Sequence, residues 1–368
     1  MSKSHKDWLI GIVDKSYKHP GANRYTAFAQ YLRLRFVEPP LRFRYFKQRW
    51  LAIIEHWIFQ RFSRAAAEPM YPNSLGLMVQ ELWTFLQMKA SPGSVFHSVK
   101  GEVDMHNLPR WSRLTKARLV ITYHDALEQF ALRSINQNFL REVDGIVALC
   151  ETQRGFFVTK MPPERVKVVH HGVDTSFFRP GKPREFGATV ISVGSYCRDH
   201  KVLSVAITQL LKNRPEVKIV LVGLGTRPQD APEKFDDPRV TYFDGVSDDE
   251  LLSLYHAADV ALVSLWAATA NNALLEAMSC GLPVVATDIG GIREYLGSNA
   301  GLLVTPFDGE AFASSILSVL RNPSLAKKMG AAGRERAERS FDYKIVAKDM
   351  QSFYDQIRAW PQAPQKTR

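Results

Sequence analysis

The sequence predicts an α/β protein with two doubly wound, Rossmann-like domains, and three observations carry this prediction. The chain has 368 residues, 45% of them hydrophobic, which is enough for two domains with separate cores. Short β-branched runs alternate with amphipathic stretches, the pattern of parallel strands whose connecting helices cover both faces of a sheet. The pattern stops at FFRPGKPREFG, residues 177–187, and then starts again. We therefore expect one domain over residues 1–180 and another over 187–342, facing each other across a cleft that binds the ligand.

The first domain is expected to open with a strand at residues 8–14, WLIGIVD, followed by a loop and a helix over 25–34. A strand, a turn with glycine and a helix in this order begin a βαβ unit. Four further strands are expected, at residues 94–99, 117–125, 144–150 and 166–174.

The second domain is expected to contain six strands, because six short apolar runs are separated by stretches with helical periodicity. These runs occupy residues 189–195, 217–223, 240–245, 260–265, 282–288 and 301–306. A helix is expected over 308–322, where Asp308 has the residue type and the place of an N-cap. The last apolar-periodic run predicts a helix over 343–360.

Composition argues against several classes of protein. No apolar run approaches the roughly 20 residues of a membrane-spanning helix, and the first residues, MSKSHKDWLIGIVDKS, contain no small-residue cleavage site. Cys150, Cys197 and Cys280 are far apart in the sequence and lie in mainly apolar stretches, which is typical of buried thiols in a reducing compartment. We therefore expect a cytoplasmic protein that is not exported.

The net charge of +11 is concentrated in the first half of the chain. Its densest part, RLRFVEPPLRFRYFKQRW, covers residues 33–50, and aromatic residues continue to residue 62. Basic residues mixed with aromatic residues suit a surface that lies against anionic lipid headgroups. The same composition also fits an ordinary helix pair with solvated charges, and it could grip nucleic acid. We favour an anionic membrane surface as the partner of residues 33–62, at the inner face of the cytoplasmic membrane, and expect no nucleic acid partner.

The clearest functional signal lies in ATANNALLEAMSCGLPVVATDIGG, residues 268–291. Asn271 or Asn272 can cap a helix that stops at Gly281, just before a buried strand. A helix start at this edge of a sheet presents free backbone N–H groups and a partial positive charge, which suit the diphosphate of a nucleotide. We therefore expect the first turn, with Ala273 and Leu274, to bind the nucleotide.

Glu276 lies one turn after Asn272, so both residues can face the same ligand. A carboxylate in this place would accept hydrogen bonds from ribose hydroxyl groups. A solvated helix glutamate is the alternative, but the apolar neighbours of Glu276 in the sequence make a solvated helix face the weaker interpretation.

The stretch NNALLEAMSCGLPVVATDIGG and the stretch HGVDTSFFRP at residues 171–180 together resemble the retaining family 4 glycosyltransferases of the GT-B fold. The resemblance is close through the second half of the chain and thin in the first quarter. It implies that HGVDTSFFRP closes the first domain, and that the helix over 343–360 crosses back onto that domain. It also implies transfer of a hexosyl group from a nucleotide-sugar to a hydroxyl acceptor.

The resemblance further implies roles for single residues. The family carries two glutamates spaced E-x7-E; the second binds the nucleotide ribose and matches Glu276, whereas the first, which contacts the donor sugar, falls on Ala268. Arg198 and Lys201 match an arginine and a lysine on the donor phosphates, where they would offset charge on the leaving diphosphate. A histidine at a strand end, which touches the donor sugar or phosphate, matches His124. Further donor-binding positions match Gly21, Ala22, Gly194, Gly290, Gly291 and Glu294.

We therefore expect a retaining glycosyltransferase in which His124, Arg198, Lys201 and Glu276 are the catalytic candidates. The expected donor is a UDP- or GDP-sugar, and the expected acceptor is a lipid-linked or membrane-associated glycan in surface polysaccharide biosynthesis. The sequence has no zinc constellation, P-loop lysine or DxD pair in a loop, so we expect no cofactor and no metal. A sugar-nucleotide epimerase of the same fold is one alternative. A silent nucleotide-sugar-binding subunit is another, and Ala268 is the residue that suggests it.

Overall fold

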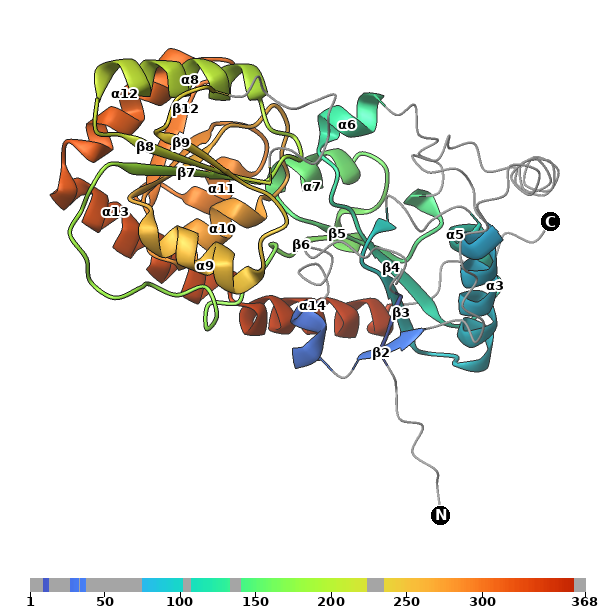
Figure 1. The fold of residues 1–368 in the computed structure, drawn as a ribbon. Helices are drawn as coiled ribbons and strands as arrows, with labels where there is room; N and C mark the ends of the chain where they lie inside the picture. Colours follow the sequence, from blue (N-terminus) through green and yellow to red (C-terminus); the bar gives the residue numbers. More distant parts are fainter. Residues whose placement is uncertain are drawn as a thin grey trace. The chain divides into compact units, whose positions relative to one another are not determined.

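The computed structural model describes residues 9–12, 27–32, 34–37, 75–101, 107–132, 140–223 and 235–360. The chain divides into two compact units. Unit 1 contains Met1–Val169 and Ala347–Arg368, and unit 2 contains His170–Val346. Each unit is built around one parallel sheet with helices against its faces (Figure 1). The predicted α/β class is therefore confirmed.

Unit 1 contains a six-stranded sheet in the order β2-β1-β3-β4-β5-β6. Its strands are β1 Leu9–Ile12, β2 Leu34–Val37, β3 Val95–Ser98, β4 Arg118–Thr122, β5 Gly145–Ala148 and β6 Val166–Val168. Its helices are η1 Ala27–Tyr31, α3 Leu75–Ala90, α5 Leu108–Ser112, α6 Leu127–Leu132, α7 Glu151–Phe157 and η3 Pro163–Arg165. All five strands predicted for this half of the chain are confirmed, each shorter than predicted.

The helix predicted over residues 25–34 is wrong. A short 3₁₀ helix ends at Tyr31, and Leu34–Val37 form β2, an edge strand that pairs in parallel with β1. The sequence LRFV places apolar and aromatic residues around one arginine, a composition that favours a half-covered strand over a helix. The predicted membrane-binding segment, residues 33–62, thus contains an edge strand near its start, and its residues 38–62 lie outside the described residues.

Unit 2 contains a second six-stranded parallel sheet, in the order β12-β11-β10-β7-β8-β9. Its strands are β7 Thr189–Val193, β8 Lys218–Val222, β9 Val240–Phe243, β10 Val260–Val263, β11 Val284–Thr287 and β12 Gly301–Val304, which confirms all six predictions. Its helices are α8 His200–Asn213, α9 Asp248–Ala257, α10 Asn272–Ser279, α11 Ile292–Leu296, α12 Gly309–Leu320, α13 Pro323–Arg336 and the π-helix η4 Ala337–Phe341. Asp308 caps α12 as predicted, by accepting a hydrogen bond from the N–H of Ala311 at 2.8 Å.

The sheet of unit 2 is covered on both faces, and its central strand β10, VALV, is apolar at every position for this reason. Val260 and Leu262 belong to a buried cluster with α8 and α12, whereas Ala261 and Val263 belong to a cluster with α9, α10 and α11. Successive side chains of a strand point to opposite faces, so a strand covered twice needs apolar residues at every position. Figure 1 shows α8 and α12 on one face and α9 and α10 on the other.

The boundary between the units lies before HGVDTSFFRP, the segment expected to close the first domain. Its residues group with unit 2 because the N–H of Val173 bonds to the carbonyl of Phe341 at 2.8 Å, and the N–H of Tyr343 bonds back to Val173. The helix predicted over 343–360 is confirmed as α14 Tyr343–Ala359. From Ala347 onward this helix groups with unit 1.

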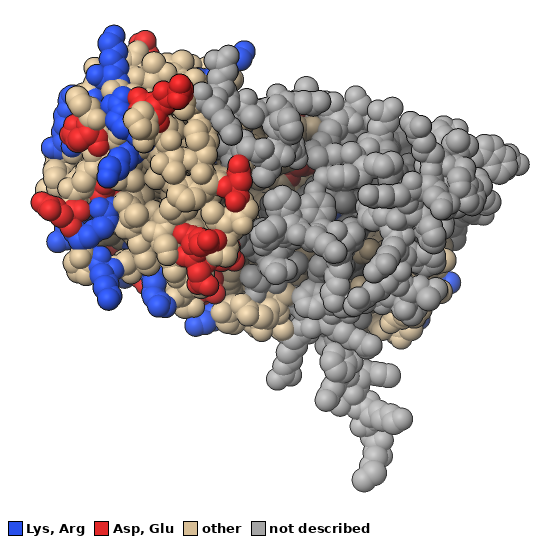
Figure 2. Space-filling model, viewed as in Figure 1, with Lys and Arg blue, Asp and Glu red and all other residues tan. Residues whose placement is uncertain are grey.

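No helix among the described residues is long and apolar enough to cross a membrane. The two signs of charge are interspersed on the coloured face of Figure 2, which displays described residues. This mixture is consistent with the charge balance of the second half of the sequence, where basic and acidic residues are nearly equal in number.

Candidate functional site

Two loops of unit 2 follow the carboxyl ends of neighbouring strands and pair with each other. One runs from Gly194 to Asp199 after β7, and the other follows β10. The N–H of Asp199 donates to the carbonyl of Ser264 at 3.2 Å, and the N–H of Trp266 donates to the carbonyl of Cys197 at 3.1 Å. Ligands bind at this edge of a doubly wound sheet. The paired loops thus form one framework at the expected binding edge.

Arg198 is a buried cation within this framework, with 4% of its surface exposed. Its Nε donates to the carbonyl oxygens of Val193 and Gly194, at 3.1 and 3.0 Å. Burial lowers the pKa of the guanidinium to about 10, and the charges of Tyr255, Cys197 and Glu276 act in the opposite direction. Arg198 therefore keeps its positive charge at neutral pH, and its Nη1 is buried without a hydrogen-bond partner.

Lys201 differs from Arg198 in its environment, although the resemblance implies that both residues lie on the donor phosphates. Lys201 is exposed on the first turn of α8, whose N-cap Asp199 accepts from the N–H of Val202 at 3.0 Å. The side chain of Arg198 turns back toward the end of β7 and is buried. The backbone between β7 and α8 includes a left-handed residue, Cys197, directly before Arg198, with a φ of 55°.

Helix α10 begins and ends where the sequence predicts. The side chain of its N-cap, Asn271, accepts from the N–H of Leu274 at 3.0 Å. The chain leaves the helix at Gly281, whose φ of 76° is the left-handed conformation common after a helix end. Asn272 is the first helical residue, and both Ala273 and Leu274 are buried. The start of α10 thus retains backbone N–H groups that the N-cap side chain does not occupy.

Glu276 is a buried carboxylate on α10, with 2% of its surface exposed. Its Oε2 accepts a hydrogen bond from the hydroxyl of Tyr255 on α9 at 3.0 Å. Burying a charged carboxylate costs free energy unless hydrogen bonds or an opposite charge compensate. Tyr255 and the nearby charge of Arg198 provide this compensation. The structure therefore brings Gly194, Arg198 and Glu276 together in unit 2.

Ala268 and Gly290 lie against each other at the same edge. A Cβ atom on Gly290 would lie 1.7 Å from the carbonyl oxygen of Ala268, and Gly290 has a φ of 53°. No larger residue fits at position 290 without moving the backbone. Ala268 is 8% exposed and packs within the apolar cluster of α10 and α11. Its methyl group leaves this position without a polar side chain.

Glu294, on α11, is half-buried and pairs with His170, whose Nε2 lies 2.6 Å from Oε1 of the carboxylate. The ring of His170 also contacts Tyr295 and Phe341 edge-on. Gly291 precedes this helix and accepts a hydrogen bond from the N–H of Glu294 at 2.9 Å. His170 was not among the predicted site residues, because two adjacent histidines at a strand end give no sign of a contact with Glu294.

His124 lies in unit 1, directly after β4, and is half-buried. The loop that carries it is fixed by Gln153, which is fully buried. Nε2 of Gln153 donates to the carbonyl oxygens of Tyr123 and Asp125, at 2.9 and 3.1 Å. A rigid amide thus sets the backbone on both sides of His124.

A second histidine, His97 on β3, lies near His124, and the sequence analysis missed it. It is buried between Thr122, at 2.8 Å from Nε2, and Tyr354 of α14, at 2.5 Å from Nδ1. Burial, and then the charge of His124, lowers the pKa of His97 to about 3. His97 is therefore neutral at physiological pH. The run SVFHSV has the pattern of an ordinary buried strand, so nothing in the sequence indicated a special role for His97.

The candidates Gly21 and Ala22 lie outside the described residues. Among the residues that the structure does describe, no group of three or more His, Cys, Asp or Glu side chains could hold a metal ion.

Two sequence profiles match successive parts of the chain. The sequence profile described as Glycosyltransferase Family 4 matches residues 93–177, and the profile described as Glycosyl transferases group 1 matches residues 187–322. The phosphatidyl-myo-inositol mannosyltransferase of Mycolicibacterium smegmatis is 28% identical over 254 residues, 65% of each chain. A glycogen synthase of Mycobacterium tuberculosis is 26% identical over 245 residues, 64% of this chain and 59% of that one. The chain thus matches just under two-thirds of the length of these relatives.

Solved structures with the same fold cover almost the whole chain. HepE from Anabaena, solved in complex with UDP, superimposes with a TM-score of 0.68 at 16% identity, over 94% of this chain and 98% of that one. The sucrose-phosphate synthase of Thermosynechococcus elongatus gives a TM-score of 0.63 at 22% identity, over 80% and 83% of the two chains. These similarities extend the likeness of fold to residues that the two sequence profiles leave out.

Proposed function

Because the chain belongs to the family 4, group 1 glycosyltransferases and has the GT-B fold, we propose that it transfers a sugar from a nucleotide-sugar to a hydroxyl acceptor with retained anomeric configuration. The observation that carries this proposal is the grouping in unit 2 of a buried cation, a buried carboxylate and a capped helix start. The Nη1 group of Arg198 has no hydrogen-bond partner, and Glu276 accepts a hydrogen bond from Tyr255. A diphosphate next to a ribose has the charge and the hydroxyl groups that such a site binds.

The proposed donor is a UDP-sugar or a GDP-sugar. Its diphosphate would lie against Arg198, Lys201 and the first turn of α10, and its ribose hydroxyls would donate to Glu276. Gly21, Ala22, Gly194, Gly290 and Gly291 would allow the backbone to approach the donor, and Glu294 would lie near the nucleotide. A UDP donor is supported by the similar structure of HepE, which was solved in complex with UDP.

The proposed reaction uses no side-chain nucleophile. The acceptor hydroxyl attacks the anomeric carbon on the face that the diphosphate leaves, and the departing phosphate takes the acceptor proton. Arg198, Lys201 and the start of α10 stabilise the negative charge that grows on the leaving group. His124 would orient the sugar. This route uses no metal, so activity is expected to be unchanged after treatment with EDTA.

The proposed acceptor is a lipid-linked or membrane-associated glycan of surface polysaccharide biosynthesis, reached from the cytoplasmic side. One relative is named for a lipid acceptor, phosphatidyl-myo-inositol. The basic and aromatic residues at 33–62 support binding to an anionic membrane surface. Flotation with vesicles that contain anionic lipid tests this part. Binding that is lost with neutral vesicles or at high salt supports it, and equal behaviour with both kinds of vesicle contradicts it.

A catalytically silent binding subunit is the second candidate, and Ala268 favours it. At this position the E-x7-E pattern has a glutamate that touches the donor sugar, and the methyl group of Ala268 cannot make a polar contact. Such a subunit would bind the donor without turning it over. Release of free nucleotide from the donor in the presence of acceptor distinguishes the enzyme from the silent subunit.

Thermal unfolding in the presence of UDP, GDP, ADP and their sugar conjugates tests donor binding. A ligand at about 100 times its dissociation constant adds roughly 2.7 kcal/mol to the stability of the folded protein. We expect stabilisation by one nucleotide and its conjugate, and loss of this effect in Glu276→Ala. Stabilisation by none of them would contradict the proposed function and leave the fold unaffected.

A further inference from the structure

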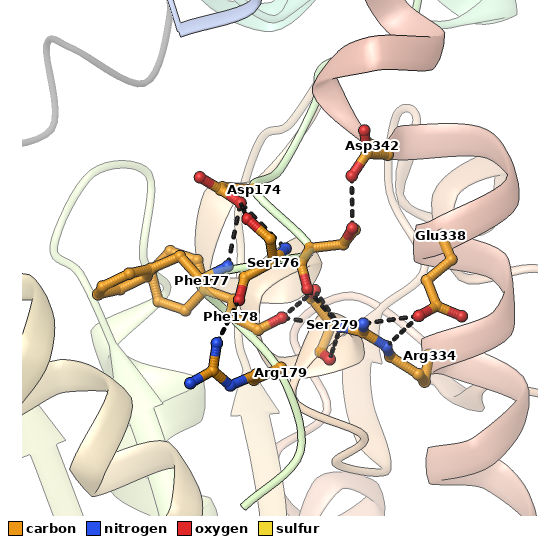
Figure 3. Close-up of polar contacts among 10 residues, drawn as sticks. Asp174, Ser176, Phe177, Phe178, Arg179, Ser279, Arg334, Glu338 and Asp342 are labelled. Carbon is orange, nitrogen blue, oxygen red and sulfur yellow. Dashed lines mark hydrogen bonds and ion pairs between the residues drawn. The ribbon is translucent and has the colours of Figure 1, made fainter.

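The segment Thr175–Phe178, which belongs to unit 2, is held next to α10 by hydrogen bonds. The Thr175 hydroxyl bonds to the carboxylate of Asp342, and the Asp174 side chain accepts from the N–H groups of Ser176 and Phe177, both at 3.0 Å. Figure 3 shows this turn beside Ser279, the last residue of α10. The backbone of the segment is thus fixed before it reaches the helix.

Arg334 of α13 joins this segment to the end of α10. Its Nη1 lies 2.9 and 2.8 Å from the carbonyl oxygens of Thr175 and Phe178, and 2.8 Å from that of Ser279. Its Nη2 forms an ion pair with Glu338 at 2.6 Å, on the opposite side of the guanidinium in Figure 3. The hydroxyl of Ser279, which is fully buried, also donates to the carbonyl of Phe178 at 2.5 Å. The last turn of α10 therefore cannot rotate without breaking buried hydrogen bonds.

The same segment reaches the middle of α10 through a pair of rings. The ring of Phe178 meets the ring of Tyr255 edge-on, with the two centroids 6.2 Å apart. The hydroxyl of Tyr255 then donates to Oε2 of Glu276. Tyr255 is 1% exposed, so the side chains packed around its ring hold it in one position. Phe178 is thus linked to α10 twice, through its carbonyl to Ser279 and through its ring and Tyr255 to Glu276.

We infer that Tyr255 and Ser279 are positioning residues that set the direction of the Glu276 carboxylate toward the ribose of the donor. Phe178 and Arg334 hold these two residues in place. One carboxylate oxygen accepts from Tyr255, so the rotation of the carboxyl group is fixed before the nucleotide arrives. Preorganised acceptors of this kind favour a ligand whose hydroxyl groups match their geometry. The inference rests on the proposed function, because it assumes that a nucleotide binds at Glu276.

The test compares the affinities of UDP and 2′,3′-dideoxy-UDP by calorimetry, or the corresponding guanosine pair where UDP does not bind. The unmodified protein is expected to prefer the ribonucleotide by about tenfold, the effect of a hydrogen bond to a charged group. Tyr255→Phe keeps the ring and removes the hydroxyl, and it is expected to reduce this preference to about threefold or less. Ser279→Ala removes one of the bonds at the helix end and is expected to reduce the preference by less.

Tyr242→Phe is the matched control. Tyr242 lies on strand β9, and its hydroxyl accepts a hydrogen bond from the N–H of Phe235 at 2.8 Å. This variant therefore also loses one tyrosine hydrogen bond. It is expected to keep the full ribose preference. If Tyr255→Phe weakens both nucleotides equally, the role of Tyr255 is structural only and the inference is overturned. If the unmodified protein binds no nucleotide, the proposed function itself fails and the inference falls with it.

Discussion

The two units stabilise the ends of their strands in opposite ways. In unit 1, the backbone around His124 is held by the neutral amide of Gln153, and the neighbouring His97 is held neutral by burial. In unit 2, the corresponding edge contains a buried guanidinium, Arg198, and a buried carboxylate, Glu276. Both edges are hydrogen-bonded. Among the described residues, the edge of unit 1 buries the carboxylate of Asp125, whereas the edge of unit 2 buries a cation and a carboxylate together.

The difference shows which edge is built for a charged ligand. A buried amide needs only its hydrogen bonds, whereas a buried charge pays a desolvation penalty that hydrogen bonds offset in part. The Nη1 group of Arg198 has no partner, so part of that penalty remains in the protein without ligand. An anion that accepts a hydrogen bond from Arg198 would offset this remaining desolvation penalty. At the described edge of unit 1, the buried carboxylate of Asp125 would repel an anion instead.

The largest expected effect tests the neutrality of His97 in unit 1. The pKa of His97 is about 3 in the folded protein and about 6.5 when unfolded. Between these values the unfolded chain binds a proton that the folded chain does not. Stability should therefore fall as the pH decreases from about 6.5 toward 3, by up to about 1.4 kcal/mol per pH unit. His97→Gln removes this contribution, so its loss of stability between pH 7 and pH 5 should be smaller.

Hydrogen exchange of the β3 and β4 amides measures this stability within unit 1. Other groups titrate in the same range, so the difference between the two proteins is the relevant quantity. Parallel pH profiles for the unmodified chain and His97→Gln would contradict the view that unit 1 depends on a neutral histidine.

The next effect concerns the close approach of two loops in unit 2. Gly290→Ala would place a methyl group against the carbonyl of Ala268, in a left-handed conformation. Overpacking of this kind costs about 1–3 kcal/mol. Chemical unfolding measures the loss. A variant as stable as the unmodified chain would show that this contact at the binding edge is not tight.

A smaller effect on stability is expected from the loss of a helix cap, and it allows a cap at the site to be compared with a cap outside it. Asn271→Ala and Asn322→Ala remove equivalent caps, because each side chain accepts at 3.0 Å from the third residue of its helix. Each variant should lose about 1 kcal/mol of stability. Only Asn271→Ala should also weaken nucleotide binding in calorimetry. An equal change in affinity for both variants would contradict a special role for the start of α10.

The smallest expected effect is that of the exposed cation. Lys201→Met should change the stability by less than about 0.5 kcal/mol, because the charge is solvated in the folded protein. Its nucleotide affinity should fall by about threefold at low salt, and the difference should narrow as the salt concentration rises. A loss that is independent of salt would indicate a buried contact in place of a screened one.

The sequence predicted the strands well and the contacts between distant residues poorly. The runs VALV and PVVA, inside VALVSL and LPVVATD, are apolar at every position because both faces of their sheet are covered, so these strands were recognisable. The strand Leu34–Val37 was missed because it lies at the edge of the sheet, inside a run dominated by basic residues. Hydrophobic periodicity is weakest where only part of a strand is covered.

Site residues could be chosen from the sequence, but their environments could not. Glu276 and a cap at Asn271 or Asn272 follow from local spacing, and the structure places Glu276 on α10 with Asn271 as the cap. The burial of Arg198 depends on a left-handed turn at Cys197, which no local pattern announces. Tyr255 and Arg334 act through contacts with residues far along the chain, and a single sequence holds no record of such contacts.

Calorimetric titration of UDP and GDP into the unmodified chain and into Glu276→Gln tests the central claim most directly. Glutamine keeps the size of the side chain and removes its charge, so the fold should remain intact. The account predicts that one nucleotide binds the unmodified chain and that Glu276→Gln weakens it by about tenfold or more. Absence of binding by either nucleotide, or equal binding by both proteins, would contradict the assignment of a nucleotide site to the charged edge of unit 2.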